Sequence, residues 1–174
     1  MIINFFNNTT AWIKGEVFES ILIFIFGLLT IVCGLLFWKF GVTLNAKALI
    51  LPLITAGLIY IVISGSLYIS NQKRLQNFQQ KFITNKVAFI QAEKKRVEDF
   101  QYMYSISKVV ATLFFIVTLC IFWFTKNASL QGWGIGLTIF AIAGLIVDYF
   151  SQERAEIYYK VILDTISETG KPFF

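Results

Sequence analysis

The sequence predicts an all-α membrane protein with four transmembrane helices arranged as two antiparallel hairpins. The second, third and fourth helices are expected to extend into a cytoplasmic helical stalk. The composition is the first indication: 57% of the 174 residues are hydrophobic, only 14% are charged and the mean hydropathy is +0.70. These values lie outside the usual range for soluble domains. The second indication is that four stretches long enough to span a membrane carry no charged residue.

Residues 1–20 predict a short interfacial helix before the first span. Thr9 or Thr10 can cap this helix, and the rings of Trp12 and Phe18 suit the headgroup region. Lys14 is the only cation here, and no A-x-A-like cleavage site follows the next apolar run. A secretory signal is therefore not indicated, and the first span is expected to be retained.

The four uncharged stretches are residues 21–38, 48–70, 109–125 and 127–147. Each approaches or exceeds the ~18 to 20 residues with which a helix crosses a ~30 Å hydrocarbon core. Helices are expected because backbone groups in lipid must form their hydrogen bonds within the segment. The connections 39–47 and 126–132 are short, so they predict transmembrane hairpins over residues 21–70 and 109–150.

The middle connection, residues 71–108, is long and holds eight of the 15 basic residues. Its apolar residues keep helical spacing on both sides of Thr84 and Asn85, which predicts a helical hairpin that breaks there. Lys94 and Glu98 form an i,i+4 pair that supports the second helix. Residues 151–174 repeat the pattern as an amphipathic helix, with Gly170 and Pro172 as its stop signal.

Basic residues predict the orientation. Twelve cations lie in the termini and the middle connection, whereas the two short connections carry only Lys39, Lys47 and Lys126. By the positive-inside rule, both termini and the middle connection face the cytoplasm of a multi-pass protein in the cell inner (plasma) membrane. The net charge of +5 then predicts contact with anionic lipid on the cytoplasmic side, and nucleic acid is the less expected partner.

Small residues recur at a spacing of seven in the spans, which favours close, left-handed helix packing. These candidate packing residues are Gly27, Gly34, Gly57, Ser64, Gly134, Gly136, Ala141 and Ala143. Packing within one chain is the simpler interpretation, and a subunit interface in a homo-oligomer is the other.

Polar residues in the spans suggest a second candidate site. Tyr60, Ser64 and Tyr68 are spaced i, i+4, i+8, and Asp148 ends the last span. Together they predict either the wall of a wetted path or ordinary hydrogen bonds between helices, with Asp148 as an interfacial anchor. Packing is favoured, because the stripe has no accompanying intramembrane cation or ring of carboxylates.

The stalk carries more apolar surface than a two-helix hairpin can bury. The predicted cytoplasmic partner face comprises Phe78, Phe82, Val87, Ile90, Val97 and Phe100. The C-terminal stripe of Ile157, Val161 and Ile166 predicts a three-helix cluster, and any remaining face would meet another subunit or a cytoplasmic protein. The stalk also carries a cluster of cations that forms either a solvated face near anionic lipid or a site that grips phosphates of lipid or nucleic acid. Its members are Lys81, Lys86, Lys94, Lys95 and Arg96.

Residue types needed for catalysis are scarce. The chain has no His, and Cys33 and Cys120 lie inside apolar runs. No Walker loop, G-x-S-x-G or H-E-x-x-H motif occurs. We therefore expect no enzyme activity, no cofactor and no metal. The expected function is an oligomeric scaffold or accessory subunit that acts through its cytoplasmic helices, and the alternative is a homo-oligomeric channel or pore-forming effector.

Overall fold

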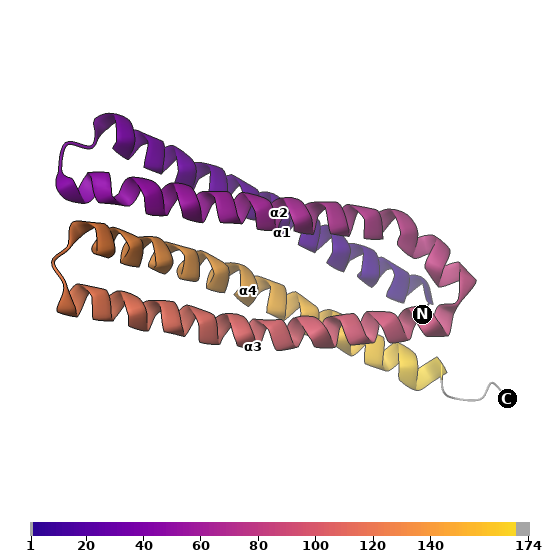
Figure 1. Ribbon diagram of the computed structural model, residues 1–174. Coiled ribbons are helices and arrows are strands. Elements are labelled where there is room, and N and C mark those ends of the chain that lie inside the picture. Colours follow the sequence, from indigo (N-terminus) through magenta and orange to yellow (C-terminus); the bar gives the residue numbers. More distant parts are fainter. Residues whose placement is uncertain (1, 170–174) are drawn as a thin grey trace.

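The computed structural model describes residues 2–169, with side chains described for residues 5–167. Over this range the chain forms four helices: α1 (Ile2–Phe40), α2 (Leu44–Thr84), α3 (Lys86–Phe124) and α4 (Ala128–Thr169). Figure 1 shows them lengthwise beside one another, with the α1–α2 and α3–α4 turns at one end. The α2–α3 turn, the start of α1 and the end of α4 lie at the other end. The stop signal at Gly170 and Pro172 lies outside the described residues.

All four helices are long and apolar enough to cross a membrane. The molecule has two parts that differ in composition. The apolar half contains residues 21–70 and 109–147, and the polar half contains residues 2–20, 71–108 and 148–169. Every helix contributes to both halves, so the candidate spans and the charged segments belong to the same continuous helices.

The helix boundaries follow from local capping chemistry. The hydroxyl of Thr43 accepts a hydrogen bond from the Ala46 N–H at 3.1 Å and so caps the start of α2. Asn85 serves two helices, because its N–H donates to the Lys81 carbonyl at 3.2 Å and its Oδ1 accepts from the Ala88 N–H at 3.0 Å. The break predicted at Thr84 and Asn85 is thus confirmed.

The N-terminal segment differs from the expected short interfacial helix, because α1 runs without a break from Ile2 to Phe40. Thr9 does not cap a helix: its hydroxyl donates to the Phe5 carbonyl at 2.9 Å and contacts the Tyr158 hydroxyl at 2.8 Å. Trp12 is only 3% exposed and lies in the core instead of on the surface. The apolar residues of this segment pack against the other helices, and that burial explains the continuous helix.

The polar half has a hydrophobic core to which all four helices contribute. Its buried members are Phe5, Trp12, Ile13, Phe78, Phe89, Ile90, Val97, Tyr104, Ala155, Tyr158 and Ile162. The expected three-helix cluster is therefore a four-helix one, because α1 supplies three of these side chains. Of the C-terminal stripe, Val161 and Ile166 pack against this core, whereas Ile157 is 58% exposed.

In the apolar half, the four helices are not equally covered by their neighbours. Over their whole lengths, α1 packs mainly on α2, α3 packs mainly on α4, and contacts between α2 and α4 join the two pairs. The apolar part of α3 stays largely uncovered, with Leu119 70% and Trp123 85% exposed. Such exposure is ordinary for a helix surrounded by lipid, because lipid tails are as apolar as these side chains.

Candidate functional site

A buried ion pair lies at the centre of the polar half. Arg74 on α2 pairs with Glu93 on α3, and their side chains are only 10% and 7% exposed. The Tyr158 hydroxyl of α4 donates to Glu93 at 3.2 Å and contacts Thr9 of α1. The Arg74 guanidinium lies 4.5 Å from the ring centroid of Trp12. These five residues, called the Arg74 cluster, connect all four helices.

The chemistry of Tyr158 suits its place in this cluster. Burial, followed by the neighbouring Glu93 carboxylate, raises the pKa of the Tyr158 hydroxyl above its ordinary value. The phenol therefore stays protonated and donates its hydrogen to Glu93. A carboxylate that accepts hydrogen bonds from both a guanidinium and a phenol has the satisfied environment that a buried charge needs.

A second set of polar contacts lies nearer the apolar half. Arg154 on α4 contacts Glu19 at 2.5 Å and Glu16 at 3.5 Å, both on α1. Ser151 donates to Glu16 at 3.1 Å, and the Tyr104 hydroxyl lies 2.7 Å from Ser151. This Arg154 cluster links α1, α3 and α4. Burial raises the pKa of Glu19, and the nearby Arg154 opposes that effect.

A cleft of about 530 Å³, called the basic cleft, lies between α2 and α3 in the polar half. Its lining is Ser70, Lys73, Arg74, Asn77, Phe78, Lys81, Ala92, Glu93, Lys95, Arg96 and Asp99. Five cations thus face two carboxylates, and Glu93 is already paired with Arg74. The cleft has room for a small molecule and carries an excess of positive charge.

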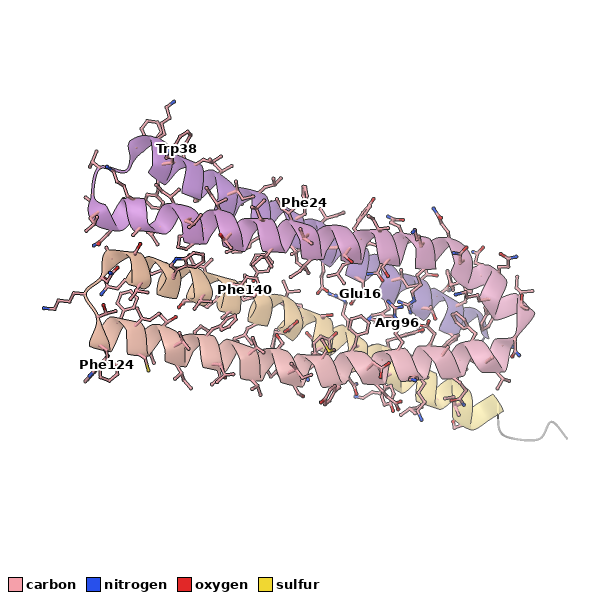
Figure 2. All side chains as sticks on the ribbon, in the orientation of Figure 1. Glu16, Phe24, Trp38, Arg96, Phe124 and Phe140 are labelled. Atoms are coloured by element: carbon pink, nitrogen blue, oxygen red, sulfur yellow. The ribbon has the colours of Figure 1, made fainter. Side chains whose placement is uncertain are left out.

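Arg96 is a partly buried cation of this cleft. Its guanidinium donates to the Asn71 amide oxygen at 3.4 Å, a long contact with a neutral partner. Burial and the neighbouring Arg74 cation lower the pKa of Arg96. Figure 2 shows Arg96 and Glu16 between the helices of the polar half, with Trp38 and Phe124 at the opposite end of the molecule.

Of the cation cluster predicted from the sequence, Lys81, Lys95 and Arg96 line this cleft, whereas Lys86 and Lys94 do not. Arg74 and Glu93 were not predicted as site residues. A signal for Arg74 was present, since Arg74 and Arg96 are equally far from the break at Asn85. Residues equidistant from the turn of an antiparallel hairpin lie at the same level. Two cations at that level needed a carboxylate between their helices, and Glu93 is one turn away from Arg96.

The candidate packing glycines lie between helices of one chain. A Cβ at Gly57 would stand 2.6 Å from the Gly27 carbonyl oxygen, and one at Gly27 would stand 2.9 Å from the Gly57 oxygen. A Cβ at Gly34 would meet Ile54 at 2.9 Å, and one at Gly136 would meet Pro52 at 2.7 Å. These glycines therefore permit close backbone approach within the chain.

The remaining candidate packing residues take part in other contacts of the apolar half. The Gly134 carbonyl accepts a hydrogen bond from Thr118 of α3 at 2.9 Å. Ser64 and Ala141 are buried, at 1% and 4% exposure. Ala143 lines a mostly apolar hollow of about 670 Å³ that has Arg154 and Glu19 in its wall.

The polar-path residues have separate partners. The Tyr60 hydroxyl donates to the Phe140 carbonyl of α4, and the Ser64 hydroxyl donates to Ile61 of its own helix at 2.9 Å. Tyr68 is 41% exposed. Asp148 of α4 lies near Ser107 and Lys108 of α3. Tyr60 thus links α2 to α4, and Ser64 bonds within α2.

The six residues of the predicted partner face differ in how far the fold buries them. Phe78, Ile90 and Val97 are at most 3% exposed and belong to the core of the polar half. Phe82 and Phe100 pack partly buried against that core. Only Val87, at 59% exposure, is on the outside.

Among the described residues, no three His, Cys, Asp or Glu side chains gather as a metal site. No family model, curated protein or solved structure matches the chain.

Proposed function

We propose that this chain is a non-enzymatic, multi-pass protein of the cell inner membrane that acts as an oligomeric scaffold or accessory subunit. The observation that carries the proposal is the construction of the polar half. All four helices supply its hydrophobic core, and the Arg74 cluster ties them together. Such a bundle presents a defined surface outside the bilayer, as a docking platform requires.

The proposed orientation places the apolar half in the bilayer and the polar half in the cytoplasm. Twelve of the 15 cations lie in the termini and the middle connection, which is the arrangement the positive-inside rule associates with the cytoplasmic side. From Asn71 to Thr84, α2 would project ~20 Å beyond the membrane at ~1.5 Å per residue. Lysines near its base would contact anionic lipid.

The proposed docking surface is the end of the bundle farthest from the membrane. Ile83 is 83% exposed and Val87 is 59% exposed, on either side of the Asn85 turn. Large apolar residues exposed to water at the tip of a bundle suit a protein partner. The buried members of the predicted partner face have a different role, since they hold the platform together.

A homo-oligomer is part of the proposal and involves the apolar half. The uncovered side of α3 offers the largest helix surface there for a second copy, since α4 is its main neighbour. Association in lipid depends on packing and not on apolar burial, so the interface would be selected by side-chain fit. The pore alternative would use the same oligomer, but the contacts of Tyr60 and Ser64 support it less.

One experiment separates the scaffold from the pore. Full-length protein purified from native membranes is examined for stoichiometric partners, and the same protein in liposomes is assayed for ion flux. We expect a co-purifying partner, no flux, and loss of the partner in the double variant Ile83→Asp, Val87→Asp. The control, Ile83→Leu with Val87→Ile, keeps the apolar surface and should retain the partner.

Flux without any partner would contradict the scaffold and support the pore. Because Ile83 and Val87 are exposed, the charged variant should fold, and an unchanged melting temperature verifies this.

A further inference from the structure

We propose that the basic cleft between α2 and α3 binds a small anion that carries at least two phosphate groups. The inference needs only a water-accessible polar half and holds whether or not the chain is a scaffold. Five cations and two carboxylates line the cleft, and the α2 and α3 backbones contact each other only slightly. The cleft of about 530 Å³ between them has room for such a ligand.

The local charge is the first argument. Glu93 and Arg74 neutralise each other, and Asp99 is the remaining carboxylate against Lys73, Lys81, Lys95 and Arg96. Like charges that line one concave surface repel each other, and a multivalent anion between them removes that repulsion.

Unsatisfied donors are the second argument. Among the described residues, nothing accepts a hydrogen bond from Nη1 of Arg74 or Nε of Arg96, although both atoms are buried. The Arg74 side chain is nine-tenths buried, so its free donor is costly unless an acceptor reaches it. Guanidinium donors match the geometry of phosphate oxygens, and both arginines line the cleft.

Preorganisation is the third argument. The guanidiniums of Arg74 and Arg96 lie 4.5 and 5.8 Å from the centroid of the Trp12 ring, and Glu93 fixes Arg74 from α3. Two arginines held in this way can bind one phosphate with little loss of side-chain entropy. The exposed, flexible Lys81 and Lys95 can then reach a second phosphate, which is why a multivalent anion is favoured over a single phosphate.

Two sources can supply this chemistry. Ser70 of the cleft ends the apolar half, so the headgroup of a phosphorylated inositol lipid would enter from that end. Lys81 lies 11 residues farther along α2, ~16 Å at ~1.5 Å per residue, and a soluble polyphosphate would enter from there. The shared feature is a pair of phosphates, and the test below distinguishes the sources.

The test uses full-length protein in nanodiscs of phosphatidylcholine, titrated calorimetrically with tripolyphosphate. We expect saturable binding, weakened about tenfold or more in Arg96→Gln and measurably in Lys95→Gln. Lys86→Gln is the matched control, since Lys86 is a cation of the same hairpin that does not line the cleft. It removes the same charge and should bind as the wild type does. Lys95 is exposed, so its variant keeps the test decisive if Arg96→Gln fails to fold.

The second arm replaces part of the phosphatidylcholine with phosphatidylinositol bisphosphate. If only this lipid raises the melting temperature, and Lys95→Gln reduces the rise while Lys86→Gln does not, the ligand is a lipid headgroup. Equal losses in Lys86→Gln and Lys95→Gln would show a diffuse basic face and overturn the proposal. Absence of an effect in both arms would overturn it as well.

Discussion

Gly27 and Gly57 allow the backbones of α1 and α2 to approach without intervening side chains. Each glycine lies where an added Cβ would press on the carbonyl oxygen of the other. Backbone atoms cannot move aside as a flexible side chain can, so even one methyl group is poorly tolerated. Close approach of this kind replaces the hydrophobic force that is missing between helices in lipid.

Gly57→Ala should destabilise the protein by about 1 to 3 kcal/mol through overpacking. Gly65→Ala is the control on the same helix, because nothing lies within 4 Å of a Cβ built there. The control should be neutral, or stabilising by up to ~1 kcal/mol through helix propensity. Thermal unfolding in detergent measures both, and equal melting temperatures would show that α1 and α2 do not approach here.

Glu93→Gln should be strongly destabilising, because it leaves the buried guanidinium of Arg74 without its counter-charge. Breaking one side of a buried pair costs about 3 to 5 kcal/mol. Glu98→Gln removes the exposed pair with Lys94, whose atoms lie 3.6 Å apart, and should cost at most about 1 kcal/mol. The melting temperatures of the Glu93→Gln and Glu98→Gln variants test this prediction. Similar values would mean that the Arg74 cluster is solvated.

Glu19 gives the molecule a pH dependence of predictable sign. Burial raises the pKa of this carboxyl in the folded state, so the folded protein binds more protons than the unfolded one in the window just above its ordinary value. The contribution of Glu19 to stability is therefore present at low pH and is lost as the pH rises through its folded-state pKa.

The Glu19→Gln variant lacks this contribution. As the pH falls from neutral toward 4.5, the ordinary value, wild-type protein should gain stability relative to the variant. Melting temperatures of the two proteins across this range provide the measurement. A relative loss of wild-type stability on acidification would show that the contact with Arg154 outweighs burial.

At the level of the helices, Asn85 is the residue between α2 and α3, where the chain reverses its direction. Its backbone is extended, with φ −152° and ψ 95°, and its side chain caps α3 while its N–H serves α2. One residue thus satisfies backbone groups of two helix ends and separates 41 residues of α2 from 39 residues of α3.

Asn85→Ala should cost about 1 kcal/mol, because the N–H of Ala88 loses its acceptor. Asn85→Asp keeps an acceptor oxygen and should stay close to the wild type. Amide hydrogen exchange over the first turn of α3, with thermal unfolding, would measure the loss. Exchange that is equally slow in Asn85→Ala would mean that the cap is dispensable.

The helix that departs most from expectation is α1. Thr9 and Thr10 are of a residue type that favours helix starts, yet each donates to a carbonyl four residues earlier within the helix. Phe5, Trp12 and Ile13 share one face at a helical spacing of seven and eight, a pattern that indicates a buried stripe. That stripe extends before the span and was the available signal for a continuous helix.

For the whole molecule, the proposed orientation makes a direct prediction about labelling. A single cysteine at Asn45 should react with an impermeant reagent outside intact cells, and one at Asn85 should react only after permeabilisation. Cys33 and Cys120 are both exposed and must first be replaced by serine. Labelling of Asn85 but not Asn45 from outside would reverse the orientation and remove the cytoplasmic docking surface.

Local information accounts for much of this architecture. Runs without charge predict four long apolar helices, and the structure has them. The break at Asn85 and the Lys94–Glu98 pair are confirmed for the same reason, since a cap and an i,i+4 pair each involve residues close in sequence.

Only the tertiary structure decided which side chains pack against one another. Periodicity shows that Val97 or Phe78 faces something apolar, but not whether the neighbour is the chain's own α1 or another protein. Ser151 and Glu16 are 135 residues apart, and Tyr158 and Glu93 are 65 apart. No local pattern links such residues, because their proximity depends on how the helix pairs pack. The basic cleft arises in the same way, because its lining comes from both α2 and α3 and depends on how these helices pack.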